Sequence, residues 1–263
     1  MKNKRTPHET LTMLLRALKL PAFCAYFAEL AKRGEKENWS YEQYLSHLVE
    51  VELAERTQRR IQRVLKRSQL PADKTLATLK LSRLPATIRR QVPNLCEGDF
   101  VDRAENILAF GLPGRGKTHL CCAIGHELVR KGKRVLFIPA YQLVQRLLAA
   151  KRDLNLEREL RRLDTFDVVL IDDIGYIQQN REEMEVLFTF LAERYERRSV
   201  MITSNLVFSQ WDRIFKDPLT TAAAIDRLVH HSIILELTGR SVREQEAAGR
   251  NTAKKSGKKK ETA

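Results

Sequence analysis

Hydrophobic residues follow two different periods along the chain, and the change falls near residue 100. Residues from about 8 to 92 show the three- and four-residue spacing of amphipathic helices. The clearest example is the set Leu11, Leu14, Leu15 and Leu18. LPAF at 20–23, the region of Gly34 and QLPADK at 69–74 interrupt this spacing. We therefore expect several short helices before residue 92.

Beyond residue 100 the apolar residues occur in short runs rich in β-branched side chains. The five runs are ENILAFG, KRVLFIP, FDVVLID, SVMITSN and HSIILEL, at 105–111, 133–139, 166–172, 199–205 and 231–237. Helical stretches separate them, and this alternation is typical of a parallel sheet covered by helices on both faces. The uninterrupted apolar character of VVLI and VLFI predicts central strands buried on both sides. The pattern predicts an α/β fold with a five-stranded parallel sheet flanked by helices, preceded by a small all-helical domain.

Composition divides the chain into three predicted regions, which are a helical N-terminal domain at 1–92, an α/β domain at 93–245 and a tail at 246–263. The tail lacks large apolar residues and is rich in lysine, a composition typical of disorder. The formal net charge is +14, and it is concentrated in the flanks. Residues 1–100 hold 19 Lys and Arg against 11 Asp and Glu, whereas residues 101–245 hold 22 against 20. Basic flanks around a nearly neutral centre indicate a polyanionic partner.

The remaining composition is that of an ordinary cytoplasmic protein. Hydrophobic residues make up 43% and charged residues 30% of the chain. No apolar run approaches the roughly 18 to 20 residues that cross a bilayer, and the first residues, MKNKRTPHETL, lack a signal-peptide core. The four cysteines show no metal-ligand spacing, and we interpret Cys121 and Cys122 as small buried residues. We expect a cytoplasmic location, no membrane partner and no structural metal.

The segment from Gly111 to Thr118 matches GxxxxGK[ST], the pattern of a phosphate-binding loop. A predicted strand precedes it and a predicted helix follows, which is the context that the motif requires. Backbone N–H groups and the helix N-terminus would face the phosphates of ATP. Lys117 would reach the β- and γ-phosphates, and the Thr118 hydroxyl would bind Mg²⁺. The predicted ATP-binding residues are Gly111, Pro113, Gly114, Arg115, Gly116, Lys117, Thr118 and His119.

Polar residues end two of the predicted strands, at the sheet edge where parallel sheets bind ligands. Asp172 would hold Mg²⁺ together with Thr118, and Asp173 would orient and deprotonate the attacking water. Alternatively, Asp173 caps the helix that follows. Asn205, after Thr203 and Ser204, would hold that water or sense the γ-phosphate, or it is simply a turn-forming residue.

The order of these motifs resembles that of the AAA+ ATPases, within the clade of bacterial initiators and helicase loaders. The strings NILAFGLPGRGKTHLCCAIG, VLIDDIGY, ITSNLVFSQW and AIDRLVHHSIILELTGRSVR are similar to the IstB-like ATPases encoded beside insertion-sequence transposases. The resemblance covers most of residues 10–245. It implies that Arg227, in AIDRL, acts as an arginine finger in the ATP site of a neighbouring subunit, completing a catalytic set with Lys117, Asp173 and Asn205. Without the resemblance, Arg227 is more simply a solvated helix residue.

The chain departs from the usual AAA+ pattern at two places. Most members have glutamate where this chain has Asp173, which is one methylene shorter, so that water activation is expected to be slow or to need an activator. Relatives of the initiator clade tolerate aspartate there. The chain after the last predicted strand is short for the helical lid that many AAA+ proteins carry. Arg243 is a candidate second sensor in place of that lid, or a plain surface arginine.

Two arginine-rich helices are candidates for binding DNA. On the helix predicted from about Ser46 to Arg67, four arginines share one face, with Arg59 and Lys66 on its edge. Another face carries Leu53, Ile61, Val64 and Leu65. Glu50, Glu52 and Glu55 precede the arginines, so that some pairing within the helix is expected. The second cluster falls on the helix predicted between the second and third strands. The candidates are Arg56, Arg59, Arg60, Arg63 and Arg67 in the first set and Lys151, Arg152, Arg158, Arg161 and Arg162 in the second. A solvated charged face is the ordinary alternative, and no signature of base-specific recognition is present.

These features together predict a DNA-stimulated ATPase that forms a homo-oligomer on target DNA, remodels the DNA, and recruits a transposase. ATP and Mg²⁺ are the expected cofactors. The main alternative is a DnaC-like loader of the replicative helicase. A small-molecule P-loop kinase and a DNA-binding adaptor with an inactive nucleotide site are further alternatives that activity measurements separate.

Overall fold

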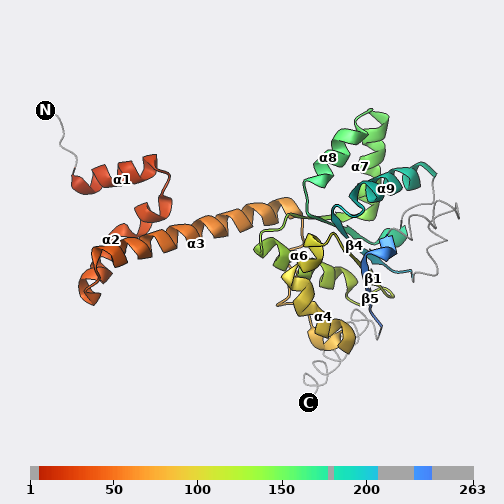
Figure 1. The fold of residues 1–263 in the computed structure, drawn as a ribbon, viewed down its shortest axis with the longest axis horizontal. Helices are drawn as coiled ribbons and strands as arrows, with labels where there is room; N and C mark the ends of the chain where they lie inside the picture. Colours follow the sequence, from red (N-terminus) through yellow and green to blue (C-terminus); the bar gives the residue numbers. More distant parts are fainter. Residues whose placement is uncertain (1–5, 177–180, 207–227, 239–263) are drawn as a thin grey trace, which may run out of the picture. The chain divides into compact units, whose positions relative to one another are not determined.

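The computed structural model describes residues 6–176, 181–206 and 228–238. The helices of the N-terminal region are α1 (Pro7–Ala17), α2 (Pro21–Glu37) and α3 (Tyr41–Ser68), followed by the 3₁₀ turn η1 (Leu81–Arg83), α4 (Ala86–Glu97) and α5 (Asp99–Asp102). The sheet region contains β1 (Asn106–Phe110), α6 (Lys117–Arg130), β2 (Val135–Pro139), α7 (Ala140–Arg152), α8 (Leu156–Asp164), β3 (Val168–Asp172), η2 (Ile174–Tyr176), α9 (Arg181–Arg194), β4 (Ser199–Ser204) and β5 (Ser232–Glu236). Figure 1 shows these elements along the chain.

All five predicted strands are present, and they form one parallel sheet in the order β2-β3-β4-β1-β5. The fold prediction is therefore confirmed. Because β1 lies between β4 and β5, the carboxyl ends of β1, β3 and β4 meet near the centre of one sheet edge. Sheets of this type bind ligands at such an edge.

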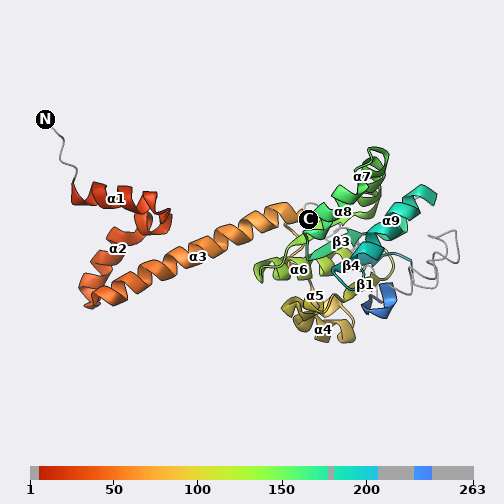
Figure 2. The ribbon, with the colours of Figure 1, turned by 45° about the horizontal axis from the view of Figure 1, so that its top comes forward.

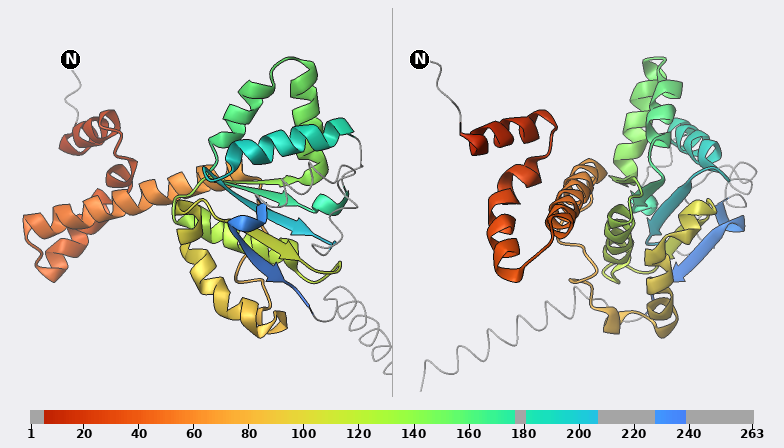
Figure 3. Two further views of the ribbon diagram at one scale, coloured as in Figure 1. Left: turned by 45° about the vertical axis from the view of Figure 1, so that its right-hand side comes forward. Right: turned by 60° about the vertical axis from the view of Figure 1, so that its left-hand side comes forward.

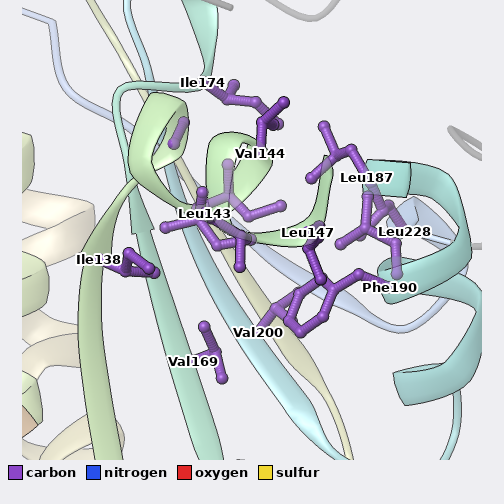
Figure 4. Close-up of a cluster of buried hydrophobic side chains, with 14 of the residues drawn as sticks. Ile138, Leu143, Val144, Leu147, Val169, Ile174, Leu187, Phe190, Val200 and Leu228 are labelled. Carbon is purple, nitrogen blue, oxygen red and sulfur yellow. The ribbon is translucent and has the colours of Figure 1, made fainter. Parts of the chain in front are cut away.

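Helices cover both faces of the sheet, with α6 on one face and α7 and α9 on the other (Figures 2 and 3). A large apolar cluster lies under α7, α8 and α9. Figure 4 shows part of it, including Leu143, Leu147 and Phe190 from the helices against Val169 and Val200 from the strands. On the opposite face, Cys121 and Cys122 of α6 are completely buried, in agreement with the sequence analysis. Burial of apolar surface on both faces is what holds the central strands in place.

Arg194, at the end of α9, is a buried charged residue that joins several chain segments. Its guanidinium donates hydrogen bonds to the carbonyl oxygens of Leu163 (3.2 Å), Phe166 (3.1 Å), Asp167 (3.2 Å) and Ser199 (2.9 Å). Burial, as the largest cause, lowers the pKa of Arg194 to about 10. These bonds fix the end of α9 to the segments that lead into β3 and β4.

The N-terminal helices differ in two respects from the predicted series of short helices. Gly34 does not separate helices, because α2 continues to Glu37 and ends with Asn38 in the left-handed conformation. The break at 69–74 is present, but the chain from 69 to 85 contains no α-helix and only the turn η1.

The described helices include none that is both long and apolar enough to cross a bilayer.

The compact units of the structure divide at a different place from the predicted domains. One unit spans 1–63 and the other 64–263, whereas the predicted helical domain ends at 92. Residues 64–92 belong with the sheet because α4 packs against α6, and because His119 and His126 of α6 contact the segment before α4. The His126 ring donates to the carbonyl oxygen of Pro71 (3.0 Å). Helical periodicity alone could not show which unit these residues join.

Candidate functional site

The phosphate-binding loop connects β1 to α6 through a backbone that only glycine adopts easily. Gly111, Gly114 and Gly116 have φ angles of 146°, 77° and 89°. A Cβ on Gly111 would lie 2.5 Å from the carbonyl oxygen of Leu237, so that a side chain has no room there. A Cβ on Gly116 would meet no atom within 4 Å, which leaves open space beside the N-terminus of α6. The loop therefore places the N-terminus of α6 beside an open cradle, as anion binding requires.

Lys117 begins α6 and lies inside the loop, with only 6% of its surface exposed. Its ammonium group donates to the carbonyl oxygens of Gly111 (2.6 Å) and Leu112 (3.1 Å) and to Oδ1 of Asn205 (2.6 Å). The structure thus brings together two predicted catalytic residues that are 88 positions apart. This arrangement holds the positive charge at the mouth of the loop.

Asp172 lies opposite Thr118, as expected of a magnesium pair. The Thr118 hydroxyl donates to Oδ1 of Asp172 (2.7 Å), and the Thr203 hydroxyl donates to the same oxygen (2.7 Å). Thr203 also accepts a hydrogen bond from the backbone N–H of Asp173 (2.8 Å). Thr203 therefore positions both aspartates, a role that was not predicted from the sequence. Its place at the end of a strand was visible, but its register opposite Asp172 was not.

Asp173 follows β3 in a left-handed conformation, with a φ of 63°. Such a conformation is unfavourable for residues other than glycine, although aspartate tolerates it better than most. The carboxylate accepts a hydrogen bond from Nδ2 of Asn205 (2.8 Å). Lys117, Asn205 and Asp173 therefore form a continuous chain of hydrogen-bonded polar groups. Asn205 contacts both charged residues, which a residue that only forms a turn does not need to do.

His119 and Arg115 have different surroundings although both were predicted to bind ATP. The His119 ring is turned toward the segment before α4, where Nε2 lies 3.2 Å from the carbonyl oxygen of Thr75 and 3.1 Å from the Thr78 hydroxyl. Its imidazole is thus engaged with the protein, and its backbone remains in the first turn of α6. Nε and Nη1 of Arg115, in contrast, are buried and have no hydrogen-bond partner. Pro113 and Gly114 form the turn that leads from β1 toward Arg115 and α6.

The residues present fit a nucleoside triphosphate and Mg²⁺. The unpartnered Arg115 atoms, the open space at Gly116 and the Lys117 ammonium favour a polyanion. Thr118 and Asp172 supply the hard oxygen ligands that Mg²⁺ prefers. The described residues contain no group of three or more histidine, cysteine or acidic side chains that could hold a metal. Mg²⁺ would therefore complete its coordination with phosphate oxygens and water, as it commonly does.

Several of the predicted DNA-binding arginines on α3 already have partners. Arg56 donates to Glu52 (2.7 Å) and to the carbonyl oxygen of Lys19 (2.9 Å), and Arg59 donates to Glu55 (2.9 Å). The expected pairing within the helix is therefore present. Arg60, Arg63 and Arg67 are exposed. Leu53, assigned to the apolar face, is also exposed.

The second basic cluster lies on two antiparallel helices, α7 and α8, not on the single helix that we expected. A turn at 153–155 separates them. Three members are paired, namely Lys151 with Glu185 (2.8 Å), Arg161 with Glu157 (2.7 Å) and Arg162 with Glu159 (3.8 Å). Arg152 and Arg158 are exposed and make no ion pair within the part of the chain that the structure describes. Arg227 and Arg243 lie outside the described residues.

Known ATP-binding proteins resemble this chain over most of its length. The family described as IstB-like ATP binding protein matches residues 13–249. An insertion sequence ATP-binding protein of Sinorhizobium fredii, y4iQ/y4nD/y4sD, is 42% identical over 90% of this chain and 80% of its own length. The insertion sequence IS21 ATP-binding protein of Pseudomonas aeruginosa is 38% identical over 91% and 90% of the two chains.

Two solved structures share the fold of this chain. DnaI superposes with a TM-score of 0.55 at 20% identity, covering 65% of this chain and 95% of its own. DnaA bound to AMPPCP and single-stranded DNA gives 0.55 at 20% identity, and this chain spans about half of it, 52%. These likenesses confirm the P-loop AAA+ fold. With the phosphate-binding loop, the acidic pair and the extent of the family match, the chain belongs to the family of IstB-like ATP-binding proteins.

Proposed function

We propose that this protein is an ATPase that assists insertion-sequence transposition by assembling on target DNA, remodelling it and recruiting a transposase. The observation that carries the proposal is the polar chain from Lys117 through Asn205 to Asp173, set beside the Thr118–Asp172 pair. A protein that only binds nucleotide has no need to connect its phosphate-sensing and water-activating groups. The relatives named as insertion sequence ATP-binding proteins support the transposition context.

The residues of the site would divide the work of hydrolysis among them. Mg²⁺, when bound, would neutralise charge on the phosphate oxygens. Lys117 would leave its carbonyl partners for the phosphates and would release Asn205, which would then hold a water molecule. Asp173, fixed through Thr203, would accept the proton of that water. Arg227 of a neighbouring subunit would offset the charge that develops on the γ-phosphoryl group.

ATP held between subunits would make the arrangement of the subunits depend on whether the γ-phosphate is present. Exposed arginines arrayed by that oligomer would neutralise DNA phosphates, which gives affinity that is independent of sequence and sensitive to salt. Arg60, Arg63 and Arg67 of α3 and Arg152 and Arg158 of the α7–α8 pair are the groups best placed for this role.

The first test measures ATP hydrolysis by the purified chain with and without long duplex DNA. We expect DNA to stimulate turnover and to promote ATP-dependent assembly. Phosphoryl transfer to a metabolite with indifference to DNA would favour a small-molecule kinase instead. A protein that stays monomeric with both ATP and duplex would contradict the proposal.

The second test examines separately the two contributions to the proposed shared ATP site, which are Lys117 from one subunit and Arg227 from its neighbour. Lys117→Ala should abolish ATP-dependent assembly, and Arg227→Ala should retain nucleotide binding while turnover falls by about 10³–10⁵. If assembly persists in Lys117→Ala, the nucleotide site is vestigial. Mixing the two variants should restore part of the activity, because an intact site in one subunit would receive Arg227 from the other. No recovery on mixing would contradict action between subunits.

The partner is tested by pull-down with the transposase and with the replicative helicase. We expect stable binding of the transposase in the presence of ATP and DNA. Stable binding of the helicase without binding of the transposase would identify a DnaC-like loader and would contradict our choice.

A further inference from the structure

The turn between α7 and α8 exposes a leucine that neither the fold nor solubility explains. Leu154 is 94% exposed, the highest value among the large apolar residues of the sheet unit that the structure describes. The turn at 153–155 lies at the end of the α7–α8 pair away from the sheet (Figures 1 and 3). The next apolar residues along the chain, Leu156 and Leu160, pack against the core instead. Leu154 therefore contributes nothing to the buried surface of this unit.

The backbone at Leu154 is also unfavourable for a leucine. Its φ angle is 55°, and it occupies the position after the C-cap in a Schellman motif, where glycine is the usual residue. The motif is complete, because the Leu154 N–H donates to the Lys151 carbonyl (3.1 Å) and the Asn155 N–H donates to the Ala150 carbonyl (2.8 Å). The apolar contact that often accompanies this motif is replaced by the polar Asn155. Glycine or asparagine would suit the turn better than leucine.

Other residues with positive φ do not share this combination. The remaining non-glycine examples in the described chain are Lys19, Asn38, Gln69, Ala104, Asp173 and Glu196. None of them is a large apolar residue. A leucine at such a position combines backbone strain with exposure of apolar surface, and a structural role accounts for neither.

The charges around Leu154 favour a nucleic acid as its partner. Arg152 precedes it and Arg158 follows it, both exposed and without an ion pair in the described chain. The acidic residues nearby are Asp153 in the turn and Glu157 in the first turn of α8, and Glu157 is paired with Arg161. An exposed apolar residue flanked in the sequence by two exposed arginines suits a base step between two phosphates.

We propose that Leu154 is an apolar wedge that enters a base step of duplex DNA from the minor groove, while Arg152 and Arg158 bind the adjacent phosphates. This inference rests on the proposed function, and it gives the remodelling of target DNA a physical cause. Insertion of an apolar side chain unstacks two base pairs and bends the duplex away from the protein. Pyrimidine–purine steps such as TA unstack most easily, so that the protein should prefer them without reading any base directly.

The test compares the full-length protein with Leu154→Asn, bound with ATP to a duplex of about 30 base pairs. One duplex carries a central TA step beside 2-aminopurine, and dyes at its two ends report bending by energy transfer. A second duplex lacks pyrimidine–purine steps. Leu18→Asn, at a leucine that is 68% exposed at the end of α1, is the matched control.

With wild-type protein and with the control, we expect increased 2-aminopurine fluorescence and end-to-end approach on the TA duplex. Leu154→Asn should lose most of both signals and about tenfold in affinity for that duplex, and its preference over the second duplex should disappear. Its melting temperature should be unchanged or higher, because asparagine suits the left-handed conformation. A structural role for the leucine would instead lower the melting temperature.

Three outcomes would overturn the inference. Bending and unstacking by Leu154→Asn equal to wild type would remove the wedge, while leaving the proposed DNA-binding ATPase intact. Loss of self-assembly by this variant in the absence of DNA would show that the leucine is buried against another copy. If wild-type protein with ATP binds neither duplex, the proposed function itself fails, and the wedge fails with it.

Discussion

Replacing Thr203 by valine tests whether this hydroxyl holds the two aspartates of the ATP site. Thr203 is 1% exposed, and valine has the same shape, so that no cavity forms. The substitution removes a bond to Asp172, worth about 1.5–3 kcal/mol for an ionised partner, and strands the Asp173 N–H, at about 1–3 kcal/mol. These contributions overlap, and we expect the free energy of unfolding to fall by about 2–4 kcal/mol.

Thermal unfolding of the nucleotide-free protein measures this loss. In a unit of this size, about 2–4 °C corresponds to each kcal/mol, so that the melting temperature should fall by about 4–16 °C. Turnover of ATP should fall as well, because the backbone at Asp173 is no longer fixed. Thr203→Ser keeps the hydroxyl and should restore both properties.

Thr189→Val is the matched control for this change. The Thr189 hydroxyl donates only to the Glu185 carbonyl within α9 (2.8 Å), and its loss should alter stability by no more than about 0.5 kcal/mol. If Thr203→Val melts and hydrolyses ATP like the control, Thr203 does not position the aspartates, and our account of the site is wrong.

The remaining predictions concern the loop, the thiols and the basic surfaces. Gly111→Ala should destabilise the protein far more than Gly116→Ala in urea unfolding, because only the first Cβ meets backbone; equal losses would contradict the close approach to Leu237. Of the four thiols, only the half-buried Cys24 should react with a thiol reagent at pH 8 in the native protein, since burial raises the pKa of Cys96 to about 11 and of Cys122 to about 12. Because these two values lie above the ordinary 9.0, stability should be constant below about pH 9 and fall as the pH rises toward 11 and 12; a rise in stability there would refute the assignment. Charge reversal at Arg60 and Arg63 should weaken DNA binding uniformly across sequences and reduce its salt dependence without loss of stability, whereas reversal at Arg56 should also lower the melting temperature because Glu52 loses its partner.

Local patterns in the sequence were sufficient for the sheet and for the phosphate-binding loop. Apolar runs mark each strand, and the glycines and Lys117 act through backbone conformation and helix position, which neighbouring residues determine. Asp172, Asp173 and Asn205 could be assigned to one edge because the carboxyl ends of parallel strands meet there.

Contacts between distant segments could be known only from the tertiary structure. The bonds of Thr203 to the aspartates depend on the register of β3 against β4, and Arg56 is occupied by a carbonyl 37 residues away. The grouping of residues 64–92 with the sheet depends on α6. The exposure of Leu154 likewise appears only after its neighbours have been buried. The sequence by itself determined which strands and motifs form, because those follow from short-range periodicity and backbone preference. The tertiary structure decided which polar groups remain available, because hydrogen bonds and burial depend on partners that the fold brings together.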